Sequence, residues 1–263
     1  MAEAGDDDEL DLELDIRLRA PRVVGERLVV LAAVCRRGFL ERSPETLGGS
    51  DEAADELEDA ETERFDLAAW LRQEGLDGAA TGSERSVLHA RIGRLAPDAV
   101  ARATWGVEAL TALAWCCGLV AEHPTDDDPT DPTDLLALLP SPWDSVRPFL
   151  TGLALRSELL IAAERERAEL WHWRAGVEAV YRQAAADERG ELRAVIREVA
   201  RAAETTGLLP ALVGDDFSIR GRPVARLGSP DLDDLTAASS ERLRAFNWVC
   251  GFGTAWDDVP TDV

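Results

Sequence analysis

Apolar side chains recur every three or four residues along most of this chain, which is the spacing of one face of an α-helix. The first such stripe follows Pro21, a residue that favours the first turn of a helix. It leaves Arg22, Arg36 and Arg37 on other faces and consists of Val24, Leu28, Leu31, Cys35 and Phe39. The pattern predicts a first core helix that begins at Pro21.

The same spacing predicts the remaining helices, at residues 65–75, 83–95, 97–120, 153–183, 191–205 and 232–250, with a short helical turn at 135–139. Ser83 is suited to be an N-cap, and Gly251 can take the left-handed conformation that often ends a helix. Only residues 215–227 alternate in the manner of β-strands, around a turn at 220–223. The fold class is therefore mostly α, a single multi-helix globular domain with at most a minor β-hairpin near residues 215–227.

Acidic residues are concentrated in blocks rather than spread along the chain. The 263 residues include 51 Asp and Glu against 28 basic residues, all of them Arg, and the formal net charge is -23. Blocks of like charge repel one another and stay solvated. We therefore expect an acidic disordered tail over residues 1–20, a helical domain over 21–263, an acidic linker at about 43–62 and an Asp/Pro-rich loop at about 123–134.

Several features predict a soluble cytoplasmic protein. The acidic N-terminus lacks the positive region of a signal peptide. The most apolar stretch, residues 105–120, contains Glu108 and is shorter than the roughly 20 residues that span a bilayer. The cysteines fall within apolar helical patterns, where we expect reduced core thiols: Cys35, Cys116, Cys117 and Cys250. No membrane partner is expected.

The sequence offers no motif for a metal or a cofactor. The only histidines, His89, His123 and His172, are not paired at metal-ligand spacing. The chain has no Lys for a phosphate-binding loop or a Schiff base, and neither G-x-S-x-G nor G-x-G-x-x-G occurs. The charge argues against a basic surface that binds nucleic acid. We therefore expect no metal, no cofactor and no nucleic-acid partner.

Several stretches resemble a known family. The ending RAFNWVCGFGTAWDDVPTD, at residues 244–262, resembles the closing signature of the bacterial family catalogued as domain of unknown function 4272. Other parts of that family are similar to LVVLAAVCRRGFLE at 28–41, EALTALAW at 108–115, and the helix from LALRSELL to WHWRAG at 153–176. The chain departs from the family in its acidic insertions and in ending TDV rather than TDT. The resemblance covers residues 24–262 and implies a fold class but no established activity.

Two polar residues fall on faces that the pattern predicts to be buried. Glu166 lies on the apolar stripe of the helix over 153–183, which consists of Leu159, Ala163, Leu170, Trp173, Val177 and Val180. On this pattern Trp173 is a core residue, whereas Trp171 points elsewhere. A partly buried carboxylate at Glu166 needs a partner, such as an Arg from another helix. Asn247 lies on the buried side of the last helix, and its amide must also be satisfied.

The C-terminal residues can supply partners for these groups. Trp256 can anchor an irregular segment while the neighbouring acids approach basic or amide side chains of the helices. The candidate polar cluster consists of Arg156, Glu166, Arg244, Asn247, Trp256, Asp257, Asp258 and Asp262. Two interpretations stay open. The cluster either pins the C-terminal residues to the helices, or forms a pocket of carboxylates suited to acid–base work or to a hard cation.

Three functions are compatible with these features. The first is a non-catalytic helical protein that binds another protein, in an accessory or immunity-like role, because no catalytic motif is found. The second is a hydrolase-type enzyme whose carboxylates come from the C-terminal WDDVPTD segment and Glu166. The third is an acidic mimic of nucleic acid, which requires the acidic runs to share one rigid face. The oligomeric state stays open.

Overall fold

The computed structural model describes residues 16–41, 51–122 and 129–262, with the backbone alone at residues 51 and 52. Its helices are α1 (Pro21–Phe39), α2 (Asp51–Gln73), α3 (Gly82–His89), α4 (Pro97–Cys116), α5 (Pro132–Ala137), α6 (Arg147–Gly152), α7 (Glu158–Gln183), α8 (Glu188–Thr205) and α9 (Ser229–Val249). Shorter elements are the 3-10 turns η1 (Asp77–Ala79), η2 (Val224–Arg226) and η3 (Trp256–Asp258) and the strands β1 (Ser218–Ile219) and β2 (Arg222–Pro223). The mostly α fold with one small hairpin confirms the predicted fold class. Within the described residues, no helix is long and apolar enough to cross a membrane.

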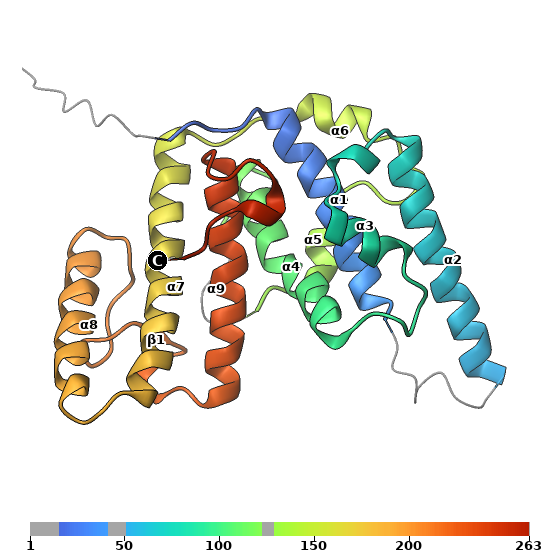
Figure 1. Ribbon diagram of the computed structural model, residues 1–263. Helices are drawn as coiled ribbons and strands as arrows, with labels where there is room; N and C mark the ends of the chain where they lie inside the picture. The colour runs from blue at the N-terminus through green and yellow to red at the C-terminus, as the bar shows by residue number, and fades with distance from the viewer. Residues whose placement is uncertain (1–15, 42–50, 123–128, 263) are drawn as a thin grey trace, which may run out of the picture.

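Four helices form the centre of the fold and lie side by side in the order α1, α4, α9 and α7 (Figure 1). Helices α2, α3 and α6 cover the outer face of α1, and α8 and the hairpin pack against α7. The largest cluster of buried side chains lies among α1, α4 and α9 and continues into Trp256 and Val259. The C-terminal residues are therefore part of the main core, and they lie across one face of this row of helices (Figure 1).

Local sequence signals set the starts of α1 and α4 and the end of α9 where the pattern predicts, whereas α3 and α4 end before the predicted residues 95 and 120. Pro21 and Pro97 occupy the first positions of α1 and α4, where the missing N–H needs no partner. Gly251 follows α9 with a φ of 91°. The hairpin turns at Arg220 and Gly221, whose φ angles are 50° and 71°, as the turn between two short antiparallel strands requires. The hairpin therefore confirms the alternation seen in the sequence.

The predicted disordered tail over residues 1–20 is too long. Residues 1–15 lie outside the described part of the chain, but residues 16–20 run along the end of α9. Arg17 and Arg19 donate their backbone N–H groups to the last carbonyls of that helix, at 3.2 and 2.9 Å. These carbonyls have no partner within the helix, so the segment caps it. Two apolar side chains of the segment also pack against the main core, namely Ile16 and Leu18.

The prediction of an acidic linker at 43–62 is wrong for residues 51–62, because these residues belong to α2. Residues 42–50 lie outside the described part of the chain. The Ala and Leu residues between the acids favour a helix, and so do the Glu residues among the acids themselves. Glu61 accepts hydrogen bonds from Arg64 Nε at 2.5 Å and from the backbone N–H of Ile92 at 3.0 Å. A high density of acids is therefore compatible with a helix when the intervening residues favour one.

The predicted Asp/Pro-rich loop at 123–134 is also shorter than expected. Residues 123–128 are not described, and α5 begins at Pro132. The Asp131 carboxylate accepts a hydrogen bond from the backbone N–H of Thr133 at 2.8 Å, and so caps α5. An acid placed before a Pro is a helix start as well as a loop residue.

Helix α7 buries a different face from the one that its apolar pattern predicts. It begins at Glu158 rather than at residue 153, because Ser157 caps it. Leu159 and Val180 of the predicted stripe are 64% and 58% exposed, and Glu166 is exposed with them. The prediction of a buried Glu166 is therefore wrong. The buried residues of the helix are Ile161, Ala168, Trp171, Arg174, Ala175 and Glu178.

The buried face of α7 looks polar in the sequence because it carries charged residues. Arg174 and Glu178 are fully buried there, and their partners include a carboxylate from the hairpin region. Trp171 is 2% exposed and meets Phe217 edge to face with ring centroids 5.2 Å apart. Trp173 is half-buried and packs against the same cluster, with its ring centroid 6.4 Å from that of Phe217, so Trp171 is the more deeply buried of the two tryptophans. Counting apolar residues alone therefore selected the outer face.

Candidate functional site around the C-terminal segment

The C-terminal segment, residues 252–262, is held by one aromatic anchor. Trp256 is 6% exposed and lies edge to face against Trp248 of α9, with ring centroids 5.6 Å apart. Arg27 of α1 places its guanidinium carbon 4.9 Å from the centroid of the Trp256 ring. Both contacts are attractive, because the edge of an indole ring is positive and its face is negative. Trp256 therefore joins the C-terminal segment to α9 and α1.

Asn247 fixes the far end of the same segment. Its amide nitrogen donates to the carbonyl of Pro260 at 2.8 Å, and its amide oxygen accepts from Arg165 Nε at 2.7 Å. The Arg165 guanidinium also lies over the ring of Phe252, 4.7 Å from its centroid. Asn247 is 5% exposed, so these bonds satisfy an amide that has little access to water. The side chain therefore links α7, α9 and the C-terminal segment.

The C-terminal segment also contacts α3. Ser83 Oγ donates to the Asp257 carboxylate, with 3.0 Å to the nearer oxygen. Thr81 caps α3 in place of the predicted Ser83, in a capping box with Glu84. One carboxylate oxygen of Glu84 accepts the backbone N–H of Thr81, and the other pairs with Arg27. The side chains of Glu84 and Arg27 are 8% and 3% exposed. Arg27 therefore lies between the cap of α3 and the indole of the C-terminal segment.

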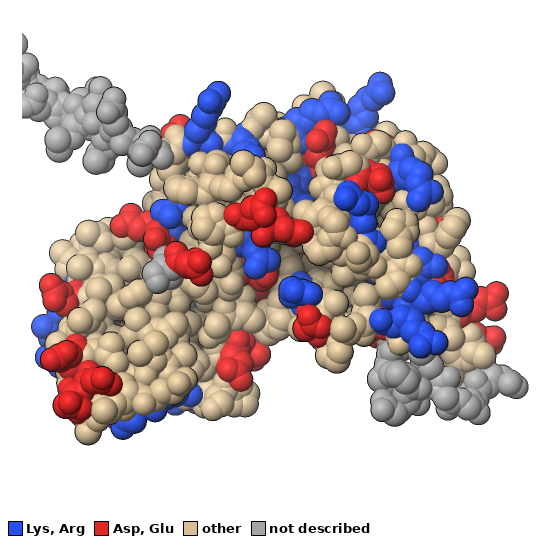
Figure 2. All heavy atoms as spheres, viewed as in Figure 1, with Lys and Arg blue, Asp and Glu red and all other residues tan. Residues whose placement is uncertain are grey.

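Within the described residues, the C-terminal segment borders an α1 cavity, an α3–α4 groove and an α7 cavity. The α1 cavity, of about 560 Å³, is lined by Arg19, Arg27, Trp248, Trp256, Asp257 and Asp258. The α3–α4 groove, of about 390 Å³, shares Trp256 and Asp257 with it as a common wall. The α7 cavity, of about 370 Å³, lies beside His172 and Trp173 at the end of the segment. Figure 2 views this face and shows acidic side chains gathered at its centre, where the segment crosses the helices.

The α3–α4 groove has an apolar floor and a charged rim. The floor consists of Leu31, Val34, Val87, Leu95, Ala99 and Ala103. The rim consists of Arg94, Arg102, Arg244, Glu241 and Asp257. Arg94 is exposed, and no hydrogen bond or ion pair joins its side chain to another described residue. Arg102 is 69% exposed and pairs, among the described residues, with the exposed Asp98 at 3.2 Å. Two cationic groups are therefore available at the rim of an apolar hollow.

Glu241 and His172, which line two of these cavities, have shifted pKa values. Burial raises the pKa of Glu241 in the α3–α4 groove, although Arg244 at 2.9 Å acts in the opposite direction. Burial lowers the pKa of His172 in the α7 cavity, where the carbonyl of Thr261 and the carboxylate of Asp262 oppose the shift. The two groups line different cavities, so they cannot act as acid and base on one substrate. Nowhere in the described ranges do three His, Cys, Asp or Glu side chains lie close enough to hold a metal ion.

The structure separates most members of the candidate polar cluster. Arg156 does not meet the C-terminal acids, because it donates to the carbonyls of Trp115 and Val120 at 2.7 and 2.8 Å. Arg244 pairs with Glu241 instead. The expected pairing of these arginines with the C-terminal acids is therefore wrong. The remaining acids are dispersed: Glu166 is exposed on α7, Asp258 is exposed on the α1 cavity, and Asp262 is exposed on the α7 cavity.

Buried ion pairs are the polar residues that the sequence pattern missed. Glu108, in the middle of α4, accepts two N–H groups of Arg242 from α9, at 2.7 and 2.9 Å. It also accepts the backbone N–H of Thr130 at 2.6 Å. The signal for this pair was visible, because an acid inside the most apolar stretch of the chain must find a partner. The partner itself lies 134 residues away in the sequence.

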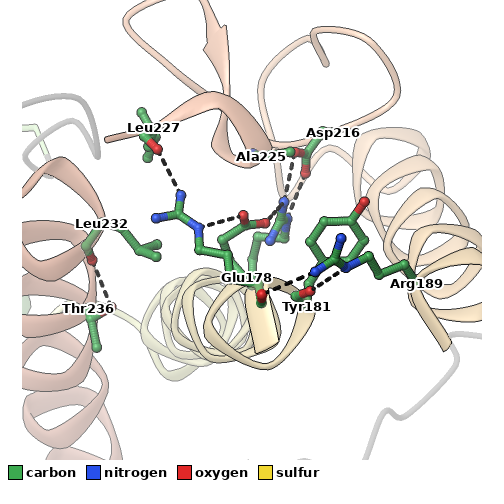
Figure 3. Close-up of polar contacts among 10 residues, drawn as sticks. Glu178, Tyr181, Arg189, Asp216, Ala225, Leu227, Leu232 and Thr236 are labelled. Carbon is green, nitrogen blue, oxygen red and sulfur yellow. Dashed lines mark hydrogen bonds and ion pairs between the residues drawn. The ribbon is translucent and has the colours of Figure 1, made fainter. Parts of the chain in front are cut away.

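A second buried network fastens the hairpin region to α7 (Figure 3). Arg174 donates to both oxygens of Asp216, at 2.7 and 2.8 Å, and to Glu178 at 3.1 Å. Asp216 also accepts the backbone N–H groups of Phe217 and Ala225, at 2.8 and 3.0 Å. Figure 3 shows Glu178 and Asp216 converging from α7 and the hairpin region. This network accounts for the hairpin position and leaves Asp216 without capacity for a ligand.

Comparison with known families identifies the chain. Residues 10–202 match the family described as Domain of unknown function (DUF4272). The chain belongs to this family. The match ends before α9, so the C-terminal signature that carried the resemblance lies outside the matched residues of this DUF4272 chain. No curated protein and no solved structure shows significant similarity to it.

Proposed function

We propose that this DUF4272 protein is a non-catalytic helical protein that binds another protein, in an accessory or immunity-like role, through the α3–α4 groove. The observation that carries this proposal is the apolar floor of that groove, enclosed by a charged rim. Protein interfaces share this anatomy, with a desolvated apolar centre and polar residues around it. The partner is expected to insert an apolar side chain above Ala99 and Ala103 and to present carboxylates to Arg94 and Arg102.

The alternative of a hydrolase has less support. That function needs at least three of the candidate carboxylates at one centre. Glu166 and Asp262 instead lie at different places from Asp257, which is bonded to Ser83. The nucleic-acid mimic needs ordered acidic runs on one face, and the runs at 6–15, 50–63 and 125–134 all lie wholly or partly outside the described residues. Protein binding is therefore the function that the geometry favours.

The cysteines support a cytoplasmic location for this function. Cys35, Cys116, Cys117 and Cys250 are all free and buried. Burial raises the pKa of Cys35 far above the range of a reactive thiol and raises the pKa of Cys117 to about 12. Unreactive thiols in the core, without a disulfide, are typical of proteins that work in a reducing compartment.

Affinity capture from the native host with Ala99→Glu as the test variant distinguishes these functions. Ala99 lies in the first turn of α4, where a Glu favours the helix, so the variant should fold. We expect the wild type to retain one stoichiometric partner that Ala99→Glu loses. Ala194→Glu, on the exposed face of α8, is the matched control and should retain it. Absence of a stoichiometric partner, or equal recovery by Ala99→Glu, would overturn the proposal.

A further inference from the structure

The α1 cavity carries a different charge from the α3–α4 groove on the other side of Trp256. Its carboxylates come from two elements, Glu26 of α1 and Asp257 and Asp258 of the C-terminal segment. Asp258 is exposed, and no hydrogen bond or ion pair joins its side chain to another described residue. Glu26 pairs at 2.9 Å with Arg22, which is 74% exposed, so this pair contributes little. The cavity therefore offers carboxylates that can bind a cationic group.

The two arginines of the α1 cavity are engaged by the protein itself. Arg19 donates from Nε and Nη2 to the carbonyls of Trp248 and Gly253, at 2.6 and 2.7 Å. Its guanidinium carbon also lies 4.6 Å from the centroid of the Trp248 ring. Arg27 forms its ion pair with Glu84. The guanidinium groups therefore form the floor of the cavity, and its carboxylates are the charged groups that stay open.

One donor of the cavity wall has no acceptor. Arg27 is 3% exposed, and its Nε makes no hydrogen bond to another described residue. A buried donor without an acceptor costs free energy, so a carbonyl oxygen bound at this wall is stabilising. A Cβ atom added at Gly78 or Gly82, which also line the cavity, would meet no atom within 4 Å, so a main chain has room here. A peptide with a basic side chain supplies both the carbonyl and the cation.

We propose that the partner of the α3–α4 groove also places a basic side chain, Arg or Lys, in the α1 cavity. This inference rests on the proposed function, because it names the chemistry of the same partner. The two hollows share Trp256 and Asp257 as a wall, so neighbouring residues of one segment reach both. The cationic head binds Asp257 and Asp258, where charge-assisted hydrogen bonds are strong. Its methylene stem packs on Val23, which is 40% exposed in the lining of the cavity.

The charges of the two hollows set the order of residues in the partner segment. An acidic residue faces Arg94 and Arg102 at the rim of the groove, and an apolar residue lies on the groove floor. A basic residue follows in the α1 cavity. A segment with the opposite order of charges places like charges together at both ends, which is unfavourable. The order of charges therefore separates this partner from other segments of similar hydrophobicity.

Selection of a displayed peptide library on the full chain tests this arrangement. Random peptides of about 12 residues are long enough to cross both hollows, at about 3.3 Å per extended residue. We expect enriched peptides to carry an acidic and a basic residue on either side of an apolar one. Fluorescence anisotropy of such a peptide should show binding at least about tenfold weaker to Asp258→Asn than to the wild type. Asp258→Asn should fold, because the side chain is exposed.

Exchange of the two charges makes the test specific for this contact. Asp258→Lys should lose the enriched peptide and should bind a version of it in which Glu replaces the basic residue. Asp234→Asn, on the exposed surface of α9, is the matched control and should leave the affinity unchanged. Enriched peptides without a basic residue, or equal affinity for Asp258→Asn and the wild type, would overturn the inference. Enrichment of no peptide would overturn it too, because one continuous segment is proposed to bind.

Ala99→Glu separates this inference from the proposed function. If Ala99→Glu abolishes peptide binding and Asp258→Asn does not, the groove binds the partner and the α1 cavity does not contribute. If neither variant weakens binding, both proposals fail. If both variants weaken it, the partner segment spans the two hollows.

Discussion

Two buried arginines lie at opposite ends of this molecule, and each joins neighbouring segments in different surroundings. Arg174 joins α7 to the hairpin region, and Arg27 joins α1 to α3 and the C-terminal segment. Arg174 is completely buried, bonds to Asp216 and Glu178, and lines none of the three cavities that border the C-terminal segment. Arg27 is 3% exposed, pairs with the single carboxylate of Glu84, stacks on an indole and lines the α1 cavity. Arg174 therefore has a structural role, because it fastens the hairpin region to α7. Arg27 lies beneath a surface that has room for a partner.

The comparison also separates two uses of the same chemistry. A carboxylate that accepts four hydrogen bonds, as Asp216 does, has no lone pair left for a ligand. The Asp257 carboxylate accepts the hydroxyl of Ser83, its one hydrogen-bond donor within the described part of the chain, and is exposed to solvent. The free carboxylate capacity therefore lies in the region of Arg27 and the C-terminal segment, where we propose binding, rather than in the region of Arg174.

Removing Arg174 should have the largest effect on stability. Arg174→Ala leaves Asp216 buried without its cation and leaves Glu178 with Arg182 alone, which costs about 3–5 kcal/mol of unfolding free energy. Urea unfolding followed by circular dichroism measures this loss. Arg102→Ala is the control, because its ion pair is exposed and should contribute less than about 0.5 kcal/mol. A loss of unfolding free energy below about 1 kcal/mol for Arg174→Ala would contradict the role of Arg174 in fastening the hairpin region to α7.

Removing Arg27 should have a smaller effect. Arg27→Ala leaves Glu84 without a partner and Trp256 without its stacked cation, but Glu84 lines the α3–α4 groove, where water can reach it. We therefore expect a loss of about 2–3 kcal/mol, measured in the same urea experiment. Arg22→Ala, on the same helix with 74% exposure, should change little. A loss of unfolding free energy equal to that of Arg174→Ala would show that water has no better access to Glu84 than to Asp216 and Glu178.

The sequence predicts best what depends on neighbouring residues. Pro21, Pro97 and Gly251 act within their own helical turns, so the ends of α1, α4 and α9 could be anticipated. Asn247 could be recognised as a buried amide in need of bonds. Its partners could not, because Arg165 and the carbonyl of Pro260 come from other segments whose approach depends on the complete fold.

The face of α7 shows why the remaining predictions failed. A count of apolar positions treats every charged residue as solvent-facing. Arg174 and Glu178 are buried because Asp216, from a segment far along the chain, neutralises the arginine. The apolar count instead selected the outer face and placed Glu166 in the core with it. The acids of the C-terminal segment were assigned arginines that in fact bind carbonyls or other acids. Long-range ion pairs therefore limit what periodicity can predict.

The smallest expected effect on stability concerns Glu241, which lines the α3–α4 groove near Arg27 and the C-terminal segment. Its pKa is raised by burial in the groove, so its folded-state pKa lies above the ordinary value of 4.5. The charged carboxylate therefore destabilises the fold once the pH rises through that folded-state pKa, and below about 4.5 both states are protonated. Glu241→Gln should raise the unfolding free energy at pH 7 by less than about 1 kcal/mol, because the pair with Arg244 is lost in exchange.

Urea unfolding of Glu241→Gln and the wild type at several pH values tests this sign. The advantage of the variant should be present at pH 7 and should disappear as the pH falls towards 4.5. Glu198→Gln, on the exposed surface of α8, should show no such pH-dependent difference. A variant less stable than the wild type at pH 7 would mean that Arg244 compensates the buried carboxylate fully. The buried carboxylate in the α3–α4 groove would then be as fully paired as the carboxylates around Arg174, and the contrast between the two regions would fail.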